Sequence, residues 1–73
     1  MAITDDDLQT FHRRLRYAMD VRDMRAADLA ESSGLCAATV REYVRGAHMP
    51  NARALAMMCR ALAVSADYLL GLV

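Results

Sequence analysis

The chain has 73 residues, of which 56% are hydrophobic, and a formal net charge of zero. This length suffices for one domain over residues 1–73, and a chain so short buries only about 60% of its unfolded surface. A large catalytic cleft with supporting shells is therefore excluded. Because no nucleophile–base pair or carboxylate pair is evident either, we expect a binding module without a small-molecule substrate and not an enzyme.

Two features of the sequence bear on where in the cell the protein is found. No apolar run approaches the roughly 20 residues that a membrane span needs. The acidic start, residues 1–7 with three consecutive Asp, is the reverse of a signal peptide. We therefore expect a cytoplasmic protein with no membrane partner.

The charges are unevenly distributed along the chain. Between Phe11 and Ala63 there are nine Arg and five acids, an excess of four positive charges. A basic middle behind an acidic start is compatible with a surface that faces phosphates. A composition merely rich in Arg and Ala produces the same pattern, so charge alone does not decide.

A first helix is predicted near the N-terminus, where Thr4 can cap it and the acids that follow lie at its positive end. Its apolar residues recur at three- and four-residue spacing as one buried stripe: Leu8, Phe11, Leu15 and Met19. Its arginines fall outside the stripe, and either follow a phosphate ridge or need no partner: Arg13, Arg14 and Arg16.

The stretch from Ala26 to Tyr43 predicts two short helices joined by a tight turn. Asp23 is a plausible cap for the second helix, which ends near Ser33. Ala30 lets two helices cross closely, and Gly34 enters the left-handed backbone region at little cost. Leu35, Val40 and Tyr43 then return one apolar face to the core. This pattern describes a helix-turn-helix.

The remaining helices are bounded by recognisable start and stop residues. A third helix is predicted over residues 37–45, capped weakly by Cys36 and stopped by Gly46 before a loop that ends at Pro50. Asn51 caps a fourth helix with an inner stripe of Leu55, Met58, Cys59 and Leu62. Ser65 caps a last short helix that carries Tyr68 and Leu69 and closes at Gly71. The sequence thus predicts an all-α domain of five short helices.

The cysteines and histidines do not predict a metal site. Cys36 and Cys59 lack metal-ligand spacing, and His12 and His48 lie far apart without Cys or carboxylate partners. We expect free thiols, no metal and no cofactor. Cys36 is either a small capping residue or, less simply, a redox switch whose thiolate is stabilised by the N–H groups of the helix that it begins.

Taken in order, several segments resemble the phage-repressor-like (lambda repressor-like, XRE-type) helix-turn-helix family. The resemblance covers roughly Phe11 to Leu70 without a gap. The segments are Arg14-Leu15-Arg16, Asp28-Leu29-Ala30-Glu31, Gly34, Thr39-Val40-Arg41-Glu42-Tyr43, Arg45-Gly46-Ala47-His48-Met49-Pro50 and Ala61 through Gly71.

This resemblance implies specific binding to double-stranded DNA, usually as a homodimer on a two-fold operator. It places the first half of the third helix in the major groove, with base-reading positions Ala37, Ala38, Arg41 and Glu42. Thr39 and the start of the second helix, at Ala26, lie near phosphates. Arg45 contacts a phosphate or caps its own helix, and Arg53 begins a helix whose N–H groups attract anions.

The chain departs from the family at several positions. Ala26 stands where relatives commonly have a Gln that binds a phosphate, and Ala37 and Ala38 stand where base-reading polar residues are common. Met19 and Val44 replace an Arg–Glu pair of many relatives. Because replacing both partners of a buried ion pair is often neutral, we expect Met19 and Val44 to touch.

The C-terminal end, residues 69–73, carries more apolar residues than so small a core must bury, and in relatives this end often contributes to dimer contacts. We expect a weak homodimer through Leu69, Leu70, Leu72 and Val73. The alternatives are a frayed tail, or a piece of a longer chain whose other part dimerises.

Two functions are therefore predicted. The first is a DNA-binding transcriptional regulator, most simply a repressor that occupies an operator. The second is a protein-interaction module with the same fold and weak or no base readout, which Ala26, Ala37, Ala38 and the zero net charge also fit.

Overall fold

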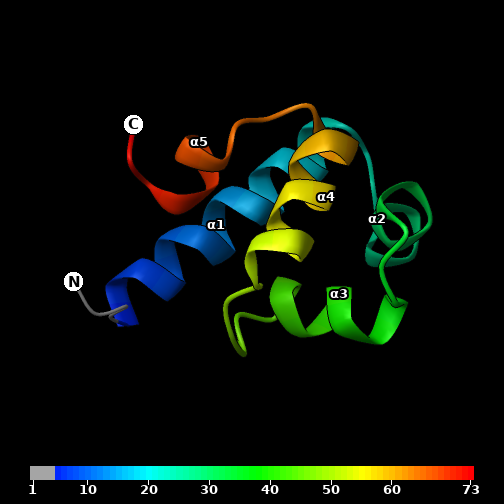
Figure 1. Ribbon diagram of the computed structural model, residues 1–73, viewed down its shortest axis with the longest axis horizontal. Coiled ribbons are helices and arrows are strands. Elements are labelled where there is room, and N and C mark those ends of the chain that lie inside the picture. The colour runs from blue at the N-terminus through cyan, green and yellow to red at the C-terminus, as the bar shows by residue number, and fades with distance from the viewer. Residues whose placement is uncertain (1–4) are drawn as a thin grey trace.

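The structure is a computed structural model that describes residues 5–73 (Figure 1). This part of the chain contains five helices: α1 (Asp5–Val21), α2 (Ala26–Ser33), α3 (Ala37–Val44), α4 (Ala52–Leu62) and α5 (Ala66–Leu70). Residues 5–73 contain no strand, and the predicted all-α fold is confirmed. The cap expected at Thr4 lies outside the described residues.

One hydrophobic core joins all five helices. The predicted stripe of α1 is confirmed, since Phe11, Leu15 and Met19 are buried and Leu8 is half-buried. Each fully buried side chain of this size stabilises the fold by about 1.5–3 kcal/mol. The largest of them come from every helix: Phe11, Leu15, Leu29, Val40, Met58, Leu62 and Leu69.

Side-chain caps start α4 and α5 where the sequence predicts. The Asn51 carboxamide oxygen accepts a hydrogen bond from the N–H of Ala54 at 2.8 Å. The Ser65 hydroxyl accepts one from the N–H of Tyr68 at 3.1 Å. Gly71, in the left-handed region at φ 77°, then ends α5. These caps are local, so the sequence alone predicts them.

The cap predicted for α2 is wrong. Asp23 does not begin α2 but ends α1, in the left-handed region at φ 53°. The N–H of Met24 bonds back to the carbonyl of Met19 at 2.9 Å, which is the closure typical of a helix C-terminus. Arg25 occupies the N-cap position of α2 instead, and its N–H donates to the Asp28 carboxylate at 2.9 Å.

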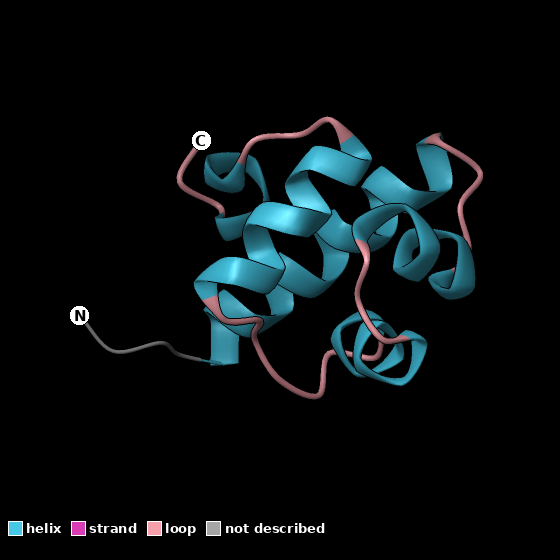
Figure 2. Cartoon of the chain, turned by 45° about the vertical axis from the view of Figure 1, so that its right-hand side comes forward, coloured by secondary structure: helices cyan, strands magenta, loops and turns pink. Residues whose placement is uncertain are grey.

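The helices place α3 and α5 at opposite sides of the domain (Figures 1 and 2). α2 packs on α3 and α4, whereas α5 packs on α1 and α4. In both views α3 forms the lower edge, and α5 with the connection from α4 lies along the upper edge. None of the helices in residues 5–73 is long and apolar enough to cross a membrane.

Candidate nucleic-acid interface

The turn between α2 and α3 has the predicted geometry. Gly34 lies at φ 79°, and its N–H donates to the carbonyl of Ala30 at 2.9 Å, which closes α2. Ser33, at the end of α2, is buried, and its hydroxyl is hydrogen-bonded. Its hydroxyl donates to the Ala30 carbonyl at 3.4 Å and accepts from the N–H of Leu35 at 3.3 Å. The turn thus accommodates a polar residue without leaving it unpaired.

The inner face of α3 is fixed by packing on both ends. Val40 and Tyr43 are buried, and the Tyr43 ring meets His48 edge-on, with centroids 5.3 Å apart. Gly46, at φ 77°, follows the end of α3 and lies close to the ring of His12. A Cβ added at Gly46 would lie 3.2 Å from Cγ of His12. These contacts turn the other face of α3 outward.

The outward face of α3 carries the residues expected to read bases. Ala38 and Arg41 are exposed, whereas Ala37 and Glu42 are half-buried. Glu42 is not an isolated acceptor, because its Oε1 lies 2.6 Å from Nη2 of Arg45 in an ion pair one turn apart. Two residues that the sequence assigns to DNA are therefore bonded to each other.

A hollow of about 290 Å³ separates α3 from the start of α4. Thr39 and Arg53, both expected near phosphates, line it together with Cys36 and Asn51. The Arg53 side chain is exposed. Arg53 and Thr39 thus lie beside one hollow next to α3, and guanidinium and hydroxyl groups both donate hydrogen bonds to anions.

Ala26, the third residue expected near phosphates, lies at a separate site. It lines a hollow of about 230 Å³ whose charged lining residues are Arg16, Arg25 and Asp20. Arg25 was not predicted as a site residue, although its place directly before α2 was a usable signal. Met19 and Val44 line the same hollow, Met19 buried and Val44 half-buried against the core. Met19 of α1 and Val44 of α3 thus line one hollow, and the contact expected between them stays a prediction.

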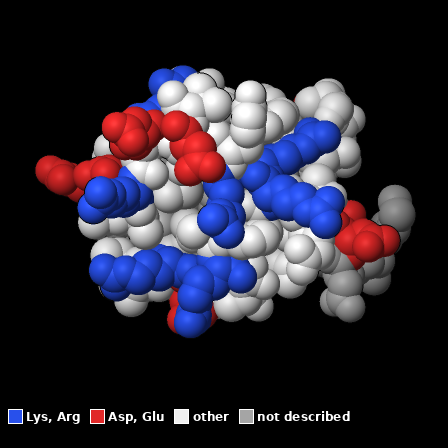
Figure 3. Space-filling model, turned by 180° about the vertical axis from the view of Figure 1, so that it is seen from behind, with Lys and Arg blue, Asp and Glu red and all other residues white. Residues whose placement is uncertain are grey.

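Arginines follow the α3 edge of the molecule. Figure 3, seen from behind, shows their side chains along the lower edge, where α3 lies, and across the middle of this face. Acidic side chains gather higher, at the level of α2, and at the right-hand end of this view, and acidic atoms also lie at the lower edge beneath the arginines. The α3 edge thus carries mostly cations, with acid among them.

Cys36 lies exposed at the N-cap of α3. The N–H groups of Thr39 and then Ala38 hold the pKa of its thiol below the ordinary value. Burial raises the pKa of Cys59. Both thiols are free, as expected. In the part of the chain that the structure describes, no three His, Cys, Asp or Glu side chains group so as to hold a metal ion.

The structure corrects the expected interface at Leu69. This side chain is 0% exposed and belongs to the core of its own domain, so it is not available to another molecule. Leu70 is half-buried, and Leu72 and Val73 are exposed. The sequence of this short helix does not show which of its apolar residues faces the core. The buried face of α5 is set by its packing on α1, which lies about fifty residues earlier in the chain.

Arg14 has a role that the sequence did not reveal. Its Nη1 donates to the carbonyls of Tyr68 at 2.8 Å and Val73 at 2.7 Å. Its guanidinium carbon lies 4.8 Å from the centroid of the Tyr68 ring. Arg14 therefore binds the C-terminal segment rather than lying free along a phosphate ridge.

A family model described as a Cro/C1-type HTH DNA-binding domain matches residues 14–73. Neither a curated protein nor a solved structure matches the chain significantly. The matched residues include all of α2 to α5 and the second half of α1, from Arg14 onward.

Proposed function

Because the chain belongs to the Cro/C1-type helix-turn-helix DNA-binding family, we propose that it is a transcriptional regulator that recognises a specific operator through α3. One observation carries this proposal: two hollows that adjoin α3 are each lined by arginine, one by Arg53 beside Thr39 and the other by Arg16 and Arg25 beside Val44. A helix flanked in this way can enter a major groove while cations meet the phosphates beside it.

We assign the readout to four positions of α3. Ala37 and Ala38 touch thymine methyl groups, Arg41 reaches a guanine and Glu42 accepts from a cytosine amino group. The phosphate contacts are Ala26, through the start of α2, with Thr39, Arg45 and Arg53. Arg45 has to release Glu42 to bind a phosphate, so the two roles compete.

The regulator proposed here is a homodimer in the cytoplasm that represses by occupying a two-fold operator and excluding polymerase. The exposed Leu72 and Val73, with the half-buried Leu70, support an interface at the C-terminal end. A dimer doubles the contacts and matches a palindromic site.

A second candidate is a protein-interaction module of the same fold. The observation that favours it is the composition of the α3 face, where two alanines adjoin an acid and a base already paired at 2.6 Å. Such a face offers few unpaired groups to bases and suits an apolar or mixed protein surface.

A salt titration of binding to random-sequence duplex DNA tests the proposed function. Phosphate contacts release counterions, so affinity should fall steeply as salt rises. Arg53→Gln should lower the slope of log K against log salt by about one phosphate contact. Arg60→Gln, in the last turn of α4, is the matched control and should leave the slope unchanged. A chain that binds no duplex at low salt favours the interaction module instead.

A further inference from the structure

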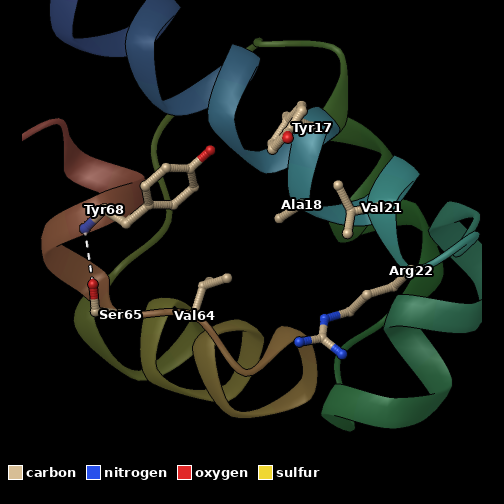
Figure 4. A pocket seen from close by; sticks show the side chains of 7 residues that line it. All are labelled: Tyr17, Ala18, Val21, Arg22, Val64, Ser65 and Tyr68. Atoms are coloured by element: carbon tan, nitrogen blue, oxygen red, sulfur yellow. Dashed lines mark hydrogen bonds between the residues drawn. The ribbon is translucent and has the colours of Figure 1, made fainter.

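A groove of about 300 Å³ opens between the second half of α1 and the start of α5 (Figure 4). Its lining comes from the end of α1, up to Arg22, and from the segment between Val64 and Tyr68 that leads into α5. No lining residue belongs to α3. The volume lies at the lower end of the range for small-molecule sites, which is about 300–1,000 Å³. The groove can therefore hold a small ligand, apart from the face proposed to meet DNA.

The walls of the groove are apolar and face solvent. Tyr17 and Val21, one turn apart on α1, are 64% and 66% exposed. Val64 and the Tyr68 ring form the opposite wall, and the buried Ala18 lies on the α1 side (Figure 4). A ligand with an apolar body would remove this surface from water, which is favourable.

The groove is preformed, because its α5 wall is held by contacts within the domain. The Tyr68 N–H donates to the Ser65 hydroxyl at 3.1 Å, and the Tyr68 ring centroid lies 4.8 Å from the guanidinium carbon of Arg14. The Val64 N–H donates to the Cys59 carbonyl at 3.1 Å. A ligand that enters such a groove has little chain to order, which lowers the entropic cost of binding.

Arg22 is the one charged residue of the lining, and it points across the opening from the end of α1 (Figure 4). Among the residues that the structure describes it has no ion-pair partner, and its neighbours in the chain, Asp20 and Asp23, do not line the groove. A guanidinium binds a carboxylate through two parallel hydrogen bonds. A phosphate group carries a charge of about −1.5 to −2, which one arginine beside apolar walls leaves partly uncompensated. The charge of the groove therefore matches a single carboxylate.

We propose that this groove binds a small monocarboxylic acid with an apolar body, whose carboxylate lies on Arg22 and whose body lies between Tyr17 and Tyr68. An aromatic body suits the two tyrosine rings, because aromatic rings pair favourably edge to face or offset. The bound acid joins the end of α1 to the start of α5. It requires neither DNA nor a second copy of the chain. No pattern in the sequence indicates this site, because its two walls lie far apart in the chain.

A titration with hydrocinnamate, a phenyl ring on a short chain that ends in a carboxylate, tests the proposal. In heteronuclear NMR of the isotope-labelled chain, the amide resonances of Ala18, Val64 and Tyr68 should shift, and those of Ala38 and Arg41 on α3 should not. We expect a Kd of about 1 mM or tighter for a ligand of this size. Hydrocinnamamide has the same shape without the charge and should bind at least about tenfold more weakly.

Two variants separate the charged and apolar parts of the site. Arg22 and Val21 are exposed, so Arg22→Gln and Val21→Ser should both fold as the parent chain does in circular dichroism. Arg22→Gln should weaken hydrocinnamate at least about tenfold and leave the amide within about twofold. Val21→Ser should weaken both ligands about equally, because it removes apolar surface that both cover. Arg13→Gln, at an exposed position of α1 outside the groove, is the matched control and should change neither affinity.

Thermal denaturation gives an independent measurement. Hydrocinnamate at about ten times its Kd should raise the Tm of the parent chain by several degrees, because the folded chain alone binds it, and most of this rise should disappear in Arg22→Gln.

Three results would overturn the proposal: no saturable shift up to about 10 mM, shifts centred on α3 instead of the groove, or equal affinities for the acid and the amide. Each of them leaves the proposed regulator standing, since duplex binding is measured without the acid. Loss of duplex binding in the salt titration likewise leaves the acid site standing.

Discussion

The two cysteines lie in opposite electrostatic environments. Cys36 is exposed at the start of α3, where the N–H groups of Thr39 and Ala38 lower the pKa of its thiol. Cys59 is half-buried in α4, where desolvation raises the pKa of its thiol. At neutral pH the thiolate fraction is therefore larger at Cys36, and the thiolate is the nucleophile.

We predict that iodoacetamide alkylates Cys36 before Cys59 at pH 7–8. As the pH falls, the reaction of Cys36 should persist to lower values than that of an unstructured cysteine, because its pKa is lowered in the folded chain. Mass spectrometry of peptides after short exposures measures both rates. Denatured chain is the control, in which the two rates should become alike; equal rates in the folded chain would contradict the prediction.

Ala63 adopts a conformation that suits glycine better. It ends α4 in the left-handed region at φ 55°, which costs an alanine about 1 kcal/mol. We predict that Ala63→Gly raises the free energy of unfolding by about 0.5–1 kcal/mol, or the Tm by a few degrees. Thermal denaturation followed by circular dichroism measures this.

Two further glycine variants serve as comparisons for the stability change expected of Ala63→Gly. Asp23→Gly, at φ 53°, should gain less, because aspartate tolerates the left-handed region better than alanine does. Ala56→Gly, inside α4, should lose about 1 kcal/mol. A loss at Ala63 similar to that at Ala56 would show that backbone strain is not relieved there.

At the scale of the element, α3 is limited by its own ion pair. Glu42 places a negative charge on the face proposed to meet DNA and occupies Arg45 at 2.6 Å. We predict that Glu42→Gln strengthens binding to random-sequence duplex several-fold at low salt, because Arg45 becomes available to a phosphate. Fluorescence anisotropy measures the change. If release of Arg45 is the cause, the gain should largely disappear in the Arg45→Ala background.

Arg41 is the other residue of α3 whose role can be decided. It is exposed and makes no ion pair within residues 6–73. If it reads a guanine, Arg41→Ala should cost about 1–3 kcal/mol at one base pair of the selected operator and relax the preference there. A competition assay across single-base variants of the site measures this. A uniform loss over all sequences would assign Arg41 to a phosphate instead.

The element boundaries were largely predictable because their determinants are local. The caps at Asn51, Ser65 and Gly34 each bond a backbone group only three or four residues away. Both partners of each cap therefore lie within one short stretch of sequence. The prediction that Asp23 caps α2 was wrong because aspartate has two uses. It caps helix N-termini, and it also tolerates the left-handed conformation that ends helices. Only the position of Met24 relative to Met19 distinguishes the two uses.

The candidate site was less predictable than the fold. Its residues on α3 follow from helical spacing, but the sequence does not show that Glu42 and Arg45 pair, that Arg25 joins Ala26, or that Leu69 turns inward. Rotamer choice decides the first of these. The others depend on packing between segments far apart in sequence, for which one sequence holds no local signal.

At the scale of the whole molecule, Arg14 connects α1 with the C-terminal segment. It makes two hydrogen bonds to backbone carbonyls and a contact with the Tyr68 ring. We predict that Arg14→Met lowers the free energy of unfolding by about 1–2 kcal/mol, since charged donors to carbonyls are lost. Arg13→Met, at an exposed neighbour, should change it by less than about 0.5 kcal/mol.

The same variant bears on the homodimer proposed above. Without Arg14 the segment that carries Leu72 and Val73 is less ordered, so self-association in sedimentation equilibrium should weaken together with stability. Urea denaturation and sedimentation of the two methionine variants provide the comparison. Equal effects at positions 13 and 14 would remove the structural role assigned to Arg14.

The large sequence separation of Arg14 from its partner determines the order in which the helices can pack during protein synthesis. Arg14 and Tyr68 are 54 positions apart, so a growing polypeptide exposes α1 long before α5 emerges. Local pairing of α2 with α3 can form early, but α1 keeps an uncovered apolar flank until nearly all of residues 5–73 have left the ribosome. We therefore expect the nascent chain to acquire resistance to proteolysis abruptly and late, and chaperones to meet it chiefly through α1.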